Sequence, residues 1–84
     1  MSFTVDQPLR QISIRTSDGS TYTLDEHHYL TSLTETRTDG SAEFFETIVV
    51  DYQDLVPGAR FIFEELVFDG SSKVHERAKI IEVV

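Results

Sequence analysis

The sequence predicts an all-β fold: six antiparallel strands in three successive hairpins, within a single domain that spans residues 1–84. The tripeptide Asp-Gly-Ser occurs three times, at residues 18–20, 39–41 and 69–71, always between runs of β-forming residues. Asp-Gly between extended segments is a strong hairpin signal, because glycine adopts positive φ without steric cost. No stretch shows a sustained helical period. These observations predict a small barrel or a compact sandwich, with an open sheet that dimerises through an edge as the alternative.

The first hairpin is expected to pair residues 10–16 with residues 21–25. Isoleucine alternates with polar residues in the first segment, and Tyr22 and Leu24 alternate with polar residues in the second. Alternation of this kind predicts a strand pair with one buried and one solvated face.

The segments that flank this hairpin are less regular. Residues 3–5 are expected either to add a short edge strand, stopped by Pro8, or to stay outside the sheet. Residues 25–30 begin with two acids, which stabilise a helix N-terminus. We therefore expect at most one helical turn there.

The second hairpin is expected to pair residues 29–37 with residues 41–50. The outgoing segment is rich in threonine and poor in apolar residues, which is typical of an edge strand or one that mainly faces water. The returning segment has apolar residues at both odd and even positions. That pattern predicts either a strand covered on both sides or a bulge near Phe45–Glu46.

The third hairpin contains the expected core strand, residues 59–68, which is the richest run of β-forming residues in the chain. Phe61 and Phe63 share one face of this strand. Glu65 interrupts that face, so it lies either at the rim or next to a bulge at Glu64–Glu65. Such a bulge would bring Leu66 and Phe68 into the core.

The partner of the core strand is the final segment, residues 73–84. A loop over residues 69–72 would place Phe63 opposite Ala78 and Glu64 opposite Arg77, and it would bring Glu65 opposite Glu76. The cationic residues of the last strand, Lys73, Arg77 and Lys79 with His75, then share one face. We interpret this stripe as an internal charge ladder rather than a groove for nucleic acid.

The net charge of −8, from 15 acids and 7 bases, is the most unusual global feature of the chain. Residues 35–69 hold nine of the acids and only two bases. Such a field repels nucleic acid and anionic membranes and favours a basic protein surface as partner. The alternative is that the charge only keeps a small, phenylalanine-rich protein soluble.

The absence of cysteine excludes disulfides and thiolate chemistry. The first ten residues do not resemble a secretory signal, and no apolar run is long enough to cross a membrane. These features predict a cytoplasmic protein.

The residue pattern indicates no catalytic, cofactor or metal site. Asp25, Glu26, His27 and His28, together with the distant His75, are of metal-ligand type, but their spacing matches no common zinc arrangement. No serine lies in a nucleophile-elbow pattern, and the four glycines stand singly in turns rather than in a phosphate-binding loop. Glu65 and Glu76 are the only carboxylates that the predicted register pairs. We therefore expect a protein that is not an enzyme.

The best candidate for an interaction site is an acidic and aromatic stretch in the middle of the chain, whose expected partner-binding residues are Glu43, Glu46, Asp51, Tyr52 and Asp54. The alternative is that its aromatic residues belong to the core. The predicted function is a small acidic protein-binding module, of which inhibitors that mimic nucleic-acid charge, including phage anti-defence proteins, are one type. Two alternatives stay open: a homo-oligomeric structural or accessory protein that assembles through strand edges, and a small-ligand-binding β-barrel.

Overall fold

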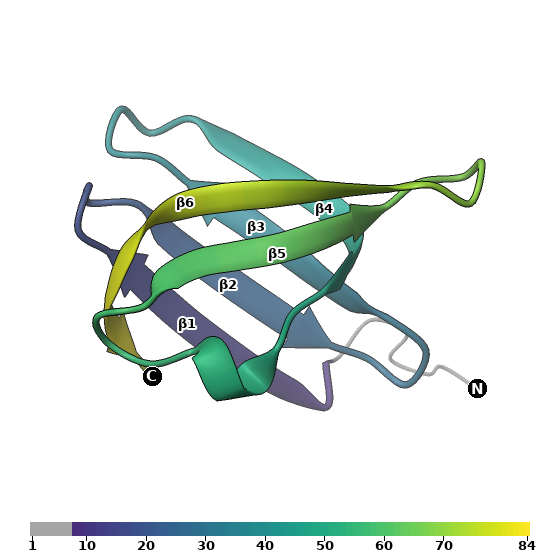
Figure 1. Cartoon of the computed structure of the whole chain (residues 1–84), viewed down its shortest axis with the longest axis horizontal. Coiled ribbons are helices and arrows are strands. Elements are labelled where there is room, and N and C mark those ends of the chain that lie inside the picture. The colour runs from purple at the N-terminus through teal and green to yellow at the C-terminus, as the bar shows by residue number, and fades with distance from the viewer. Residues whose placement is uncertain (1–7) are drawn as a thin grey trace, which may run out of the picture.

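The computed structural model describes residues 8–84 as a closed antiparallel barrel (Figure 1). Each strand pairs with the next along the chain, and the last pairs with the first. The strands are β1 (Arg10–Thr16), β2 (Thr21–Glu26), β3 (Thr31–Thr36), β4 (Ala42–Val49), β5 (Arg60–Leu66) and β6 (Ser72–Val83), with a 3₁₀ turn, η1 (Tyr52–Asp54), between β4 and β5. The predicted fold class and the three hairpins are confirmed. The strand considered at residues 3–5 lies outside the described residues.

All three Asp-Gly-Ser segments form the same three-residue turn. In the first, the Thr16 amide donates to the Ser20 carbonyl at 3.1 Å, and the Asp18 carboxylate accepts from the Ser20 amide at 3.0 Å. The second and third turns repeat both bonds, from Arg37 to Ser41 and from Val67 to Ser71. Each glycine has a φ near +87°, a conformation that other residues adopt at a cost (φ 88°, 88° and 86°).

The tight third turn sets a different β5–β6 register from the one predicted. It closes between Val67 and Ser71, so Phe63 lies opposite His75 instead of Ala78. The predicted pairs of Glu64 with Arg77 and of Glu65 with Glu76 are both wrong: Glu64 faces Val74 and Glu65 faces Lys73.

The bulge considered at Glu64–Glu65 is also absent from the described part of β5. The register shifts between Arg60 and Ile62 instead. Consequently Leu66 and Phe68 stay outside the core, and Phe68 is fully exposed at the tip of the hairpin.

The core is a set of interlocking rings inside the barrel. Phe61 and Phe63 are buried, as predicted, with ring centroids 5.4 Å apart. Tyr22 packs against Phe61 at 4.8 Å and Phe45 against Phe63 at 5.1 Å. Every strand contributes, and the buried apolar residues are Ile14, Tyr22, Leu24, Leu33, Phe45, Ile48, Phe61, Phe63 and Ile80.

The structure overturns one prediction for the first half of the chain and places the helical turn elsewhere. The threonine-rich strand β3 is not an edge: it lies between β2 and β4, and Leu33 and Glu35 are buried. Barrel closure gives every strand two neighbours, which the composition of one strand does not reveal. The helical turn lies at η1 rather than at residues 25–30, because β2 continues through Glu26 and the Asp51 carboxylate caps η1 at the Gln53 amide.

The predicted bulge in β4 is confirmed, and it has a structural consequence. Leu33 pairs with Phe45 but Thr31 pairs with Ile48, so β4 carries an extra residue at this point. A bulge bends its strand and increases the local twist. Beyond it, β4 meets β5 over only two residue pairs, Ile48–Glu65 and Val49–Glu64.

Candidate interaction surface at the β4–β5 seam

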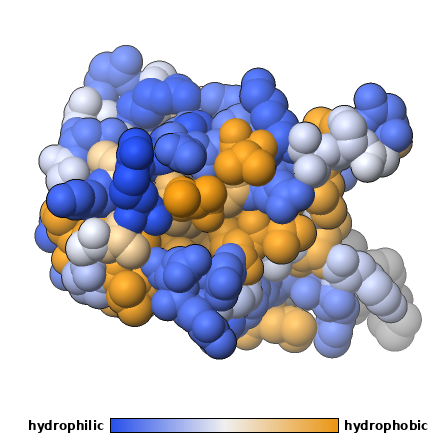
Figure 2. Space-filling model, in the orientation of Figure 1, coloured by the Kyte–Doolittle hydropathy of each residue, from blue (hydrophilic) through white to orange (hydrophobic). Residues whose placement is uncertain are grey.

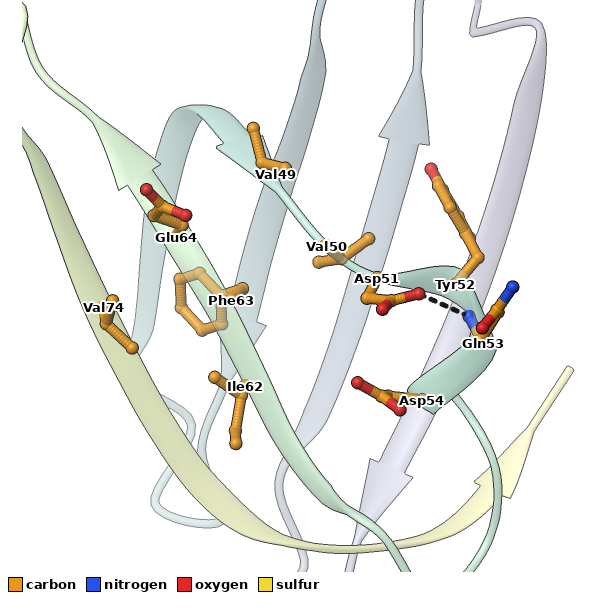
Figure 3. A pocket seen from close by; sticks show the side chains of 10 residues that line it. All are labelled: Val49, Val50, Asp51, Tyr52, Gln53, Asp54, Ile62, Phe63, Glu64 and Val74. Atoms are coloured by element: carbon orange, nitrogen blue, oxygen red, sulfur yellow. Dashed lines mark hydrogen bonds between the residues drawn. The ribbon is translucent and has the colours of Figure 1, made fainter.

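We use the term seam for the short contact between β4 and β5 and the two hollows that flank it. The first hollow, here called the cleft, lies between β4 and the β5–β6 hairpin and has a volume of about 420 Å³. It is lined by Phe44, Glu46, Thr47, Glu65, Leu66, Val67 and Phe68. The second, here called the groove, has a volume of about 640 Å³ and lies between η1, β5 and β6 (Figure 3).

Large apolar side chains are exposed around the seam. Phe44 and Val74 are each 62% exposed, Phe68 is fully exposed, and Ile62 and Leu66 are close to half exposed. Figure 2 shows hydrophobic residues gathered across the middle of one face, with hydrophilic residues above and below them. A contiguous exposed apolar patch on a soluble protein commonly marks an interaction site.

Uncompensated carboxylates surround the same seam. Glu46 lines the cleft, while Asp51, Asp54 and Glu64 line the groove, and none of the four has an ion-pair partner within residues 8–84. All five arginines are paired with other acids, namely Glu26, Glu35, Glu43, Glu76 and Glu82. Four unpaired carboxylates therefore lie beside the exposed apolar residues. Within residues 8–84, Asp18, Asp25, Asp39 and Asp69 also lack an ion pair.

The structure brings together only part of the predicted site. Asp51 and Asp54 flank the groove, as Figure 3 shows, and Glu46 lies on the other side of the seam. Glu43 is set apart, because its carboxylate accepts from the Arg37 guanidinium at 2.9 Å.

Tyr52 is one of the residues that line the groove, but it also contacts other parts of the barrel. Its side chain points away from β5 in Figure 3. Its hydroxyl hydrogen-bonds to Glu26, and the Arg10 guanidinium lies 5.2 Å from the ring centroid. This predicted anchor thus connects η1 to β1 and β2, and it is 41% exposed.

Sequence reasoning missed the residues that β5 and β6 contribute, namely Ile62, Glu64, Leu66, Phe68 and Val74. Glu64 was assigned to Arg77 by a register that the structure does not have. One signal for Phe68 was present: it occupies the first turn position, where the two other Asp-Gly-Ser turns carry Ser17 and Thr38. An aromatic residue at that position has no core to enter.

A second polar cluster lies at the rim of the barrel and is internally satisfied. Glu35, only 2% exposed, accepts from Arg77 Nε at 2.6 Å and from Arg37 at 3.0 Å. Burial would raise the pKa of Glu35, but the Arg77 guanidinium outweighs it and holds that pKa below its ordinary value. Burial, with the nearby Glu35 charge, raises the pKa of Tyr22 to about 12. Of the basic stripe predicted on β6, Arg77 forms an internal charge pair, with Glu35 rather than Glu64 as its partner, whereas Lys73 and Lys79 form no ion pair within residues 8–84.

Metal-ligand residue types do not converge in the described chain. His27 and His28 lie in the β2–β3 connection, whereas His75 on β6 lies 3.0 Å from Glu65. Residues 8–84 contain no group of three or more potential ligands able to hold a metal ion. The only paired carboxylates that the sequence suggested, Glu65 and Glu76, are not opposite each other.

Comparison with known proteins adds no assignment. No protein-family model matches the chain, and no curated protein or solved structure is significantly similar to it. Within residues 8–84 there is no helix of the length and apolar character that a membrane crossing requires.

Proposed function

We propose that the protein is a non-enzymatic protein-binding module that engages a basic surface of another protein through the β4–β5 seam. One observation carries the proposal: four carboxylates that lack an ion pair within residues 8–84, Glu46, Asp51, Asp54 and Glu64, surround exposed apolar residues. An apolar centre with a charged rim is the usual arrangement of a protein interface.

The two parts of the surface have different tasks in this proposal. Phe44 and Phe68 provide aromatic anchors of the kind that dominate binding energy. The carboxylates attract a basic partner over distances of about 10 Å at moderate salt, and they exclude acidic competitors. An inhibitor that mimics nucleic-acid charge, acting on a cytoplasmic enzyme as phage anti-defence proteins do, would use a surface of this type.

The test compares two charge variants of equal net charge. The first, Glu46→Gln/Asp51→Asn/Asp54→Asn/Glu64→Gln, neutralises the seam, and asparagine at residue 51 keeps an oxygen to cap η1. The second, Asp18→Asn/Asp25→Asn/Asp39→Asn/Glu82→Gln, removes the same charge elsewhere. Proteins retained by the immobilised chain at about 0.05 M salt and released at about 0.5 M are identified, and their affinities are then measured.

We expect the seam variant to bind the partner at least about tenfold more weakly, mainly through slower association, and the control variant to bind nearly as the wild type does. Melting temperatures of both variants should stay near that of the wild type. Equal losses for the two variants would show that total charge, rather than the seam, drives binding. An affinity that resists both the seam variant and high salt would refute the proposal.

A second candidate function is a homo-oligomer that assembles through strand edges. The observation that favours it is the edge of β4, which β5 covers at only Ile48 and Val49. Self-association through backbone pairing and apolar contacts survives high salt. Mass measurements across concentration at about 0.5 M salt separate this candidate from the first.

A further inference from the structure

We propose that the partner binds by adding a β-strand to the barrel: an extended segment with basic and apolar residues pairs with the edge of β4 at Ala42–Phe45. This inference rests on the proposed function and specifies how the partner occupies the seam. Strand addition to an exposed sheet edge is an established mode of peptide recognition, in which backbone bonds give affinity and side chains give specificity.

The backbone of β4 presents unused hydrogen-bonding groups to the cleft. The Arg37 amide donates to the Ser41 carbonyl at 2.8 Å, which shows that Ser41 faces β3. Backbone groups alternate between the two sides of a strand, so the N–H and C=O groups of Ala42 and Phe44 point away from β3. On that side β5 pairs only with Ile48 and Val49. Within residues 8–84, Ala42 and Phe44 therefore have no ladder partner there.

Two features of the structure coincide with the gap. The bulge between Phe45 and Ile48 interrupts β4, and a bulge bends its strand. β5 ends at Leu66, so the chain turns into β6 before it reaches Ala42 and Phe44. The β5–β6 hairpin extends outward beyond the rest of the barrel, as Figure 1 shows at the upper right. The cleft that results has the edge of β4 on one wall and Leu66 to Phe68 on the other.

Apolar side chains are positioned to receive alternate residues of an added strand. Successive side chains of a strand point to opposite faces. One set would lie on the outer face, where Phe44 and Leu66 are exposed and Phe68 projects from the hairpin tip. An extended segment thus gains apolar contact from both walls of the cleft as well as backbone bonds from one.

The charge of the edge selects a basic occupant. Glu43 and Glu46 lie along this part of β4; Glu43 is paired with Arg37, whereas Glu46 has no ion-pair partner within residues 8–84. Pairing with a second copy would bring the same acids together in one short ladder, between molecules that each carry a net charge of −8. A segment with lysine or arginine at alternate positions has no such repulsion.

The probe for the test is a peptide of about eight residues that alternates lysine and valine, long enough to span the edge. It is added to the full chain labelled with ¹⁵N, and amide exchange is followed by NMR. We expect the Ala42 and Phe44 amides to exchange at least about tenfold more slowly in the complex, because they become hydrogen-bonded.

Two further peptides separate backbone pairing from charge attraction. One is N-methylated at every lysine and the other at every valine, so both keep the charge and each lacks the donors along one of its edges. We expect one isomer to bind at least about tenfold more weakly than the other, since only one edge faces β4.

A variant of the protein tests the same backbone hydrogen bond by changing its donor, the Ala42 N–H group, instead of the peptide. Ala42→Pro removes an N–H that the barrel does not use, and Ala42→Ser keeps it as the matched control. The proline variant should lose affinity for the unmethylated peptide while the serine variant retains it. Melting curves check that both fold, and the N-methylated peptides decide the question if the proline variant does not.

Three outcomes would overturn strand addition. The first is peptide binding that depends on the four seam carboxylates, with equal affinity for both methylated isomers and unchanged exchange at Ala42 and Phe44; the proposed function would then stand without it. The second is protection of both amides in the unbound protein, with a dimeric mass, which would assign the edge to a second copy. The third is no binding of the unmethylated peptide at millimolar concentration.

Discussion

The ladders β1–β2 and β2–β3 each join six residue pairs, whereas β4 and β5 share only two. Side-chain burial follows the same division. No large apolar residue of the described strands β1, β2 and β3 is exposed, but β4, β5 and β6 expose Phe44, Val49, Ile62, Leu66, Val74 and Ile81. Ion pairing differs too, since Glu35 on β3 is buried against Arg77, while four acids of the seam, Glu46, Asp51, Asp54 and Glu64, have no ion-pair partner within residues 8–84.

In the proposed function, the parts of the barrel that stabilise the fold and the part that binds the partner are therefore different. A continuous ladder leaves few backbone groups unpaired and buries its inward residues. Where the bulge interrupts the ladder, backbone groups, apolar side chains and carboxylates all remain available. Substitutions of buried residues should therefore lower stability, whereas substitutions of the exposed residues of the seam should lower affinity for the proposed partner.

The largest expected effect compares two adjacent rings of β4. Phe45→Ala should lower the free energy of unfolding by about 3–5 kcal/mol, as Phe61→Ala and Phe63→Ala should, because each removes a buried ring. Phe44→Ala should change it by less than about 0.5 kcal/mol, since that ring points outward. Urea denaturation of the four variants measures this directly. A loss at Phe44 as large as that at Phe45 would mean that the outer face of β4 is packed rather than open.

Substitution of the buried carboxylate Glu35 on β3 should have a smaller effect on the free energy of unfolding. Glu35→Gln should destabilise by about 1–3 kcal/mol, because it weakens charged hydrogen bonds to Arg77, whose side chain is only 23% exposed. Glu43→Gln is the matched control, since Glu43 pairs with Arg37 at the surface and its loss should leave stability nearly unchanged.

The Glu35–Arg77 pair also predicts how stability changes with pH. The folded-state pKa of Glu35 lies below its ordinary value of 4.5, so its contribution is complete above that value and is lost as the pH falls through the folded pKa. Asp18, Glu26, Asp39 and Asp69 have lowered pKa values as well. The contribution of Glu35 is therefore measured as the difference in the free energy of unfolding between the wild type and Glu35→Gln. This difference should shrink on acidification below about pH 4.5. A difference that grows on acidification would contradict the assignment.

The smallest expected effect on stability comes from the glycines of the three Asp-Gly-Ser turns, and it distinguishes the first turn from the other two. Alanine at Gly40 or Gly70 should cost about 1–2 kcal/mol through its left-handed backbone alone. Alanine at Gly19 should cost more, because its Cβ would lie 2.6 Å from Cγ2 of Thr38 in the neighbouring turn. Adding Thr38→Ser, which removes Cγ2, should bring Gly19→Ala back to the cost of the other two. If all three single variants melt alike, the first two turns are not in contact.

Several features follow from the sequence by itself. The Asp-Gly-Ser turns form where expected, since they depend on the backbone preferences of adjacent residues. Phe61 and Phe63 point inward together because strand alternation is a local rule. The bulge near Phe45–Glu46 was also visible as apolar residues at both parities. The excess of acids around Asp51 and Asp54 is a property of composition.

Only the tertiary structure decided which charges and edges remain available. Glu35 and Arg77 are 42 residues apart and meet because β3 and β6 both border the barrel interior. The β5–β6 register depends on the length of a single loop. The loop is shorter than predicted, so Glu64 lies opposite Val74 instead of Arg77. The packing of η1 turned Tyr52 toward Glu26. Pairing between distant segments is a property of barrel closure, and no local pattern in one strand specifies which side chain its distant neighbour will present.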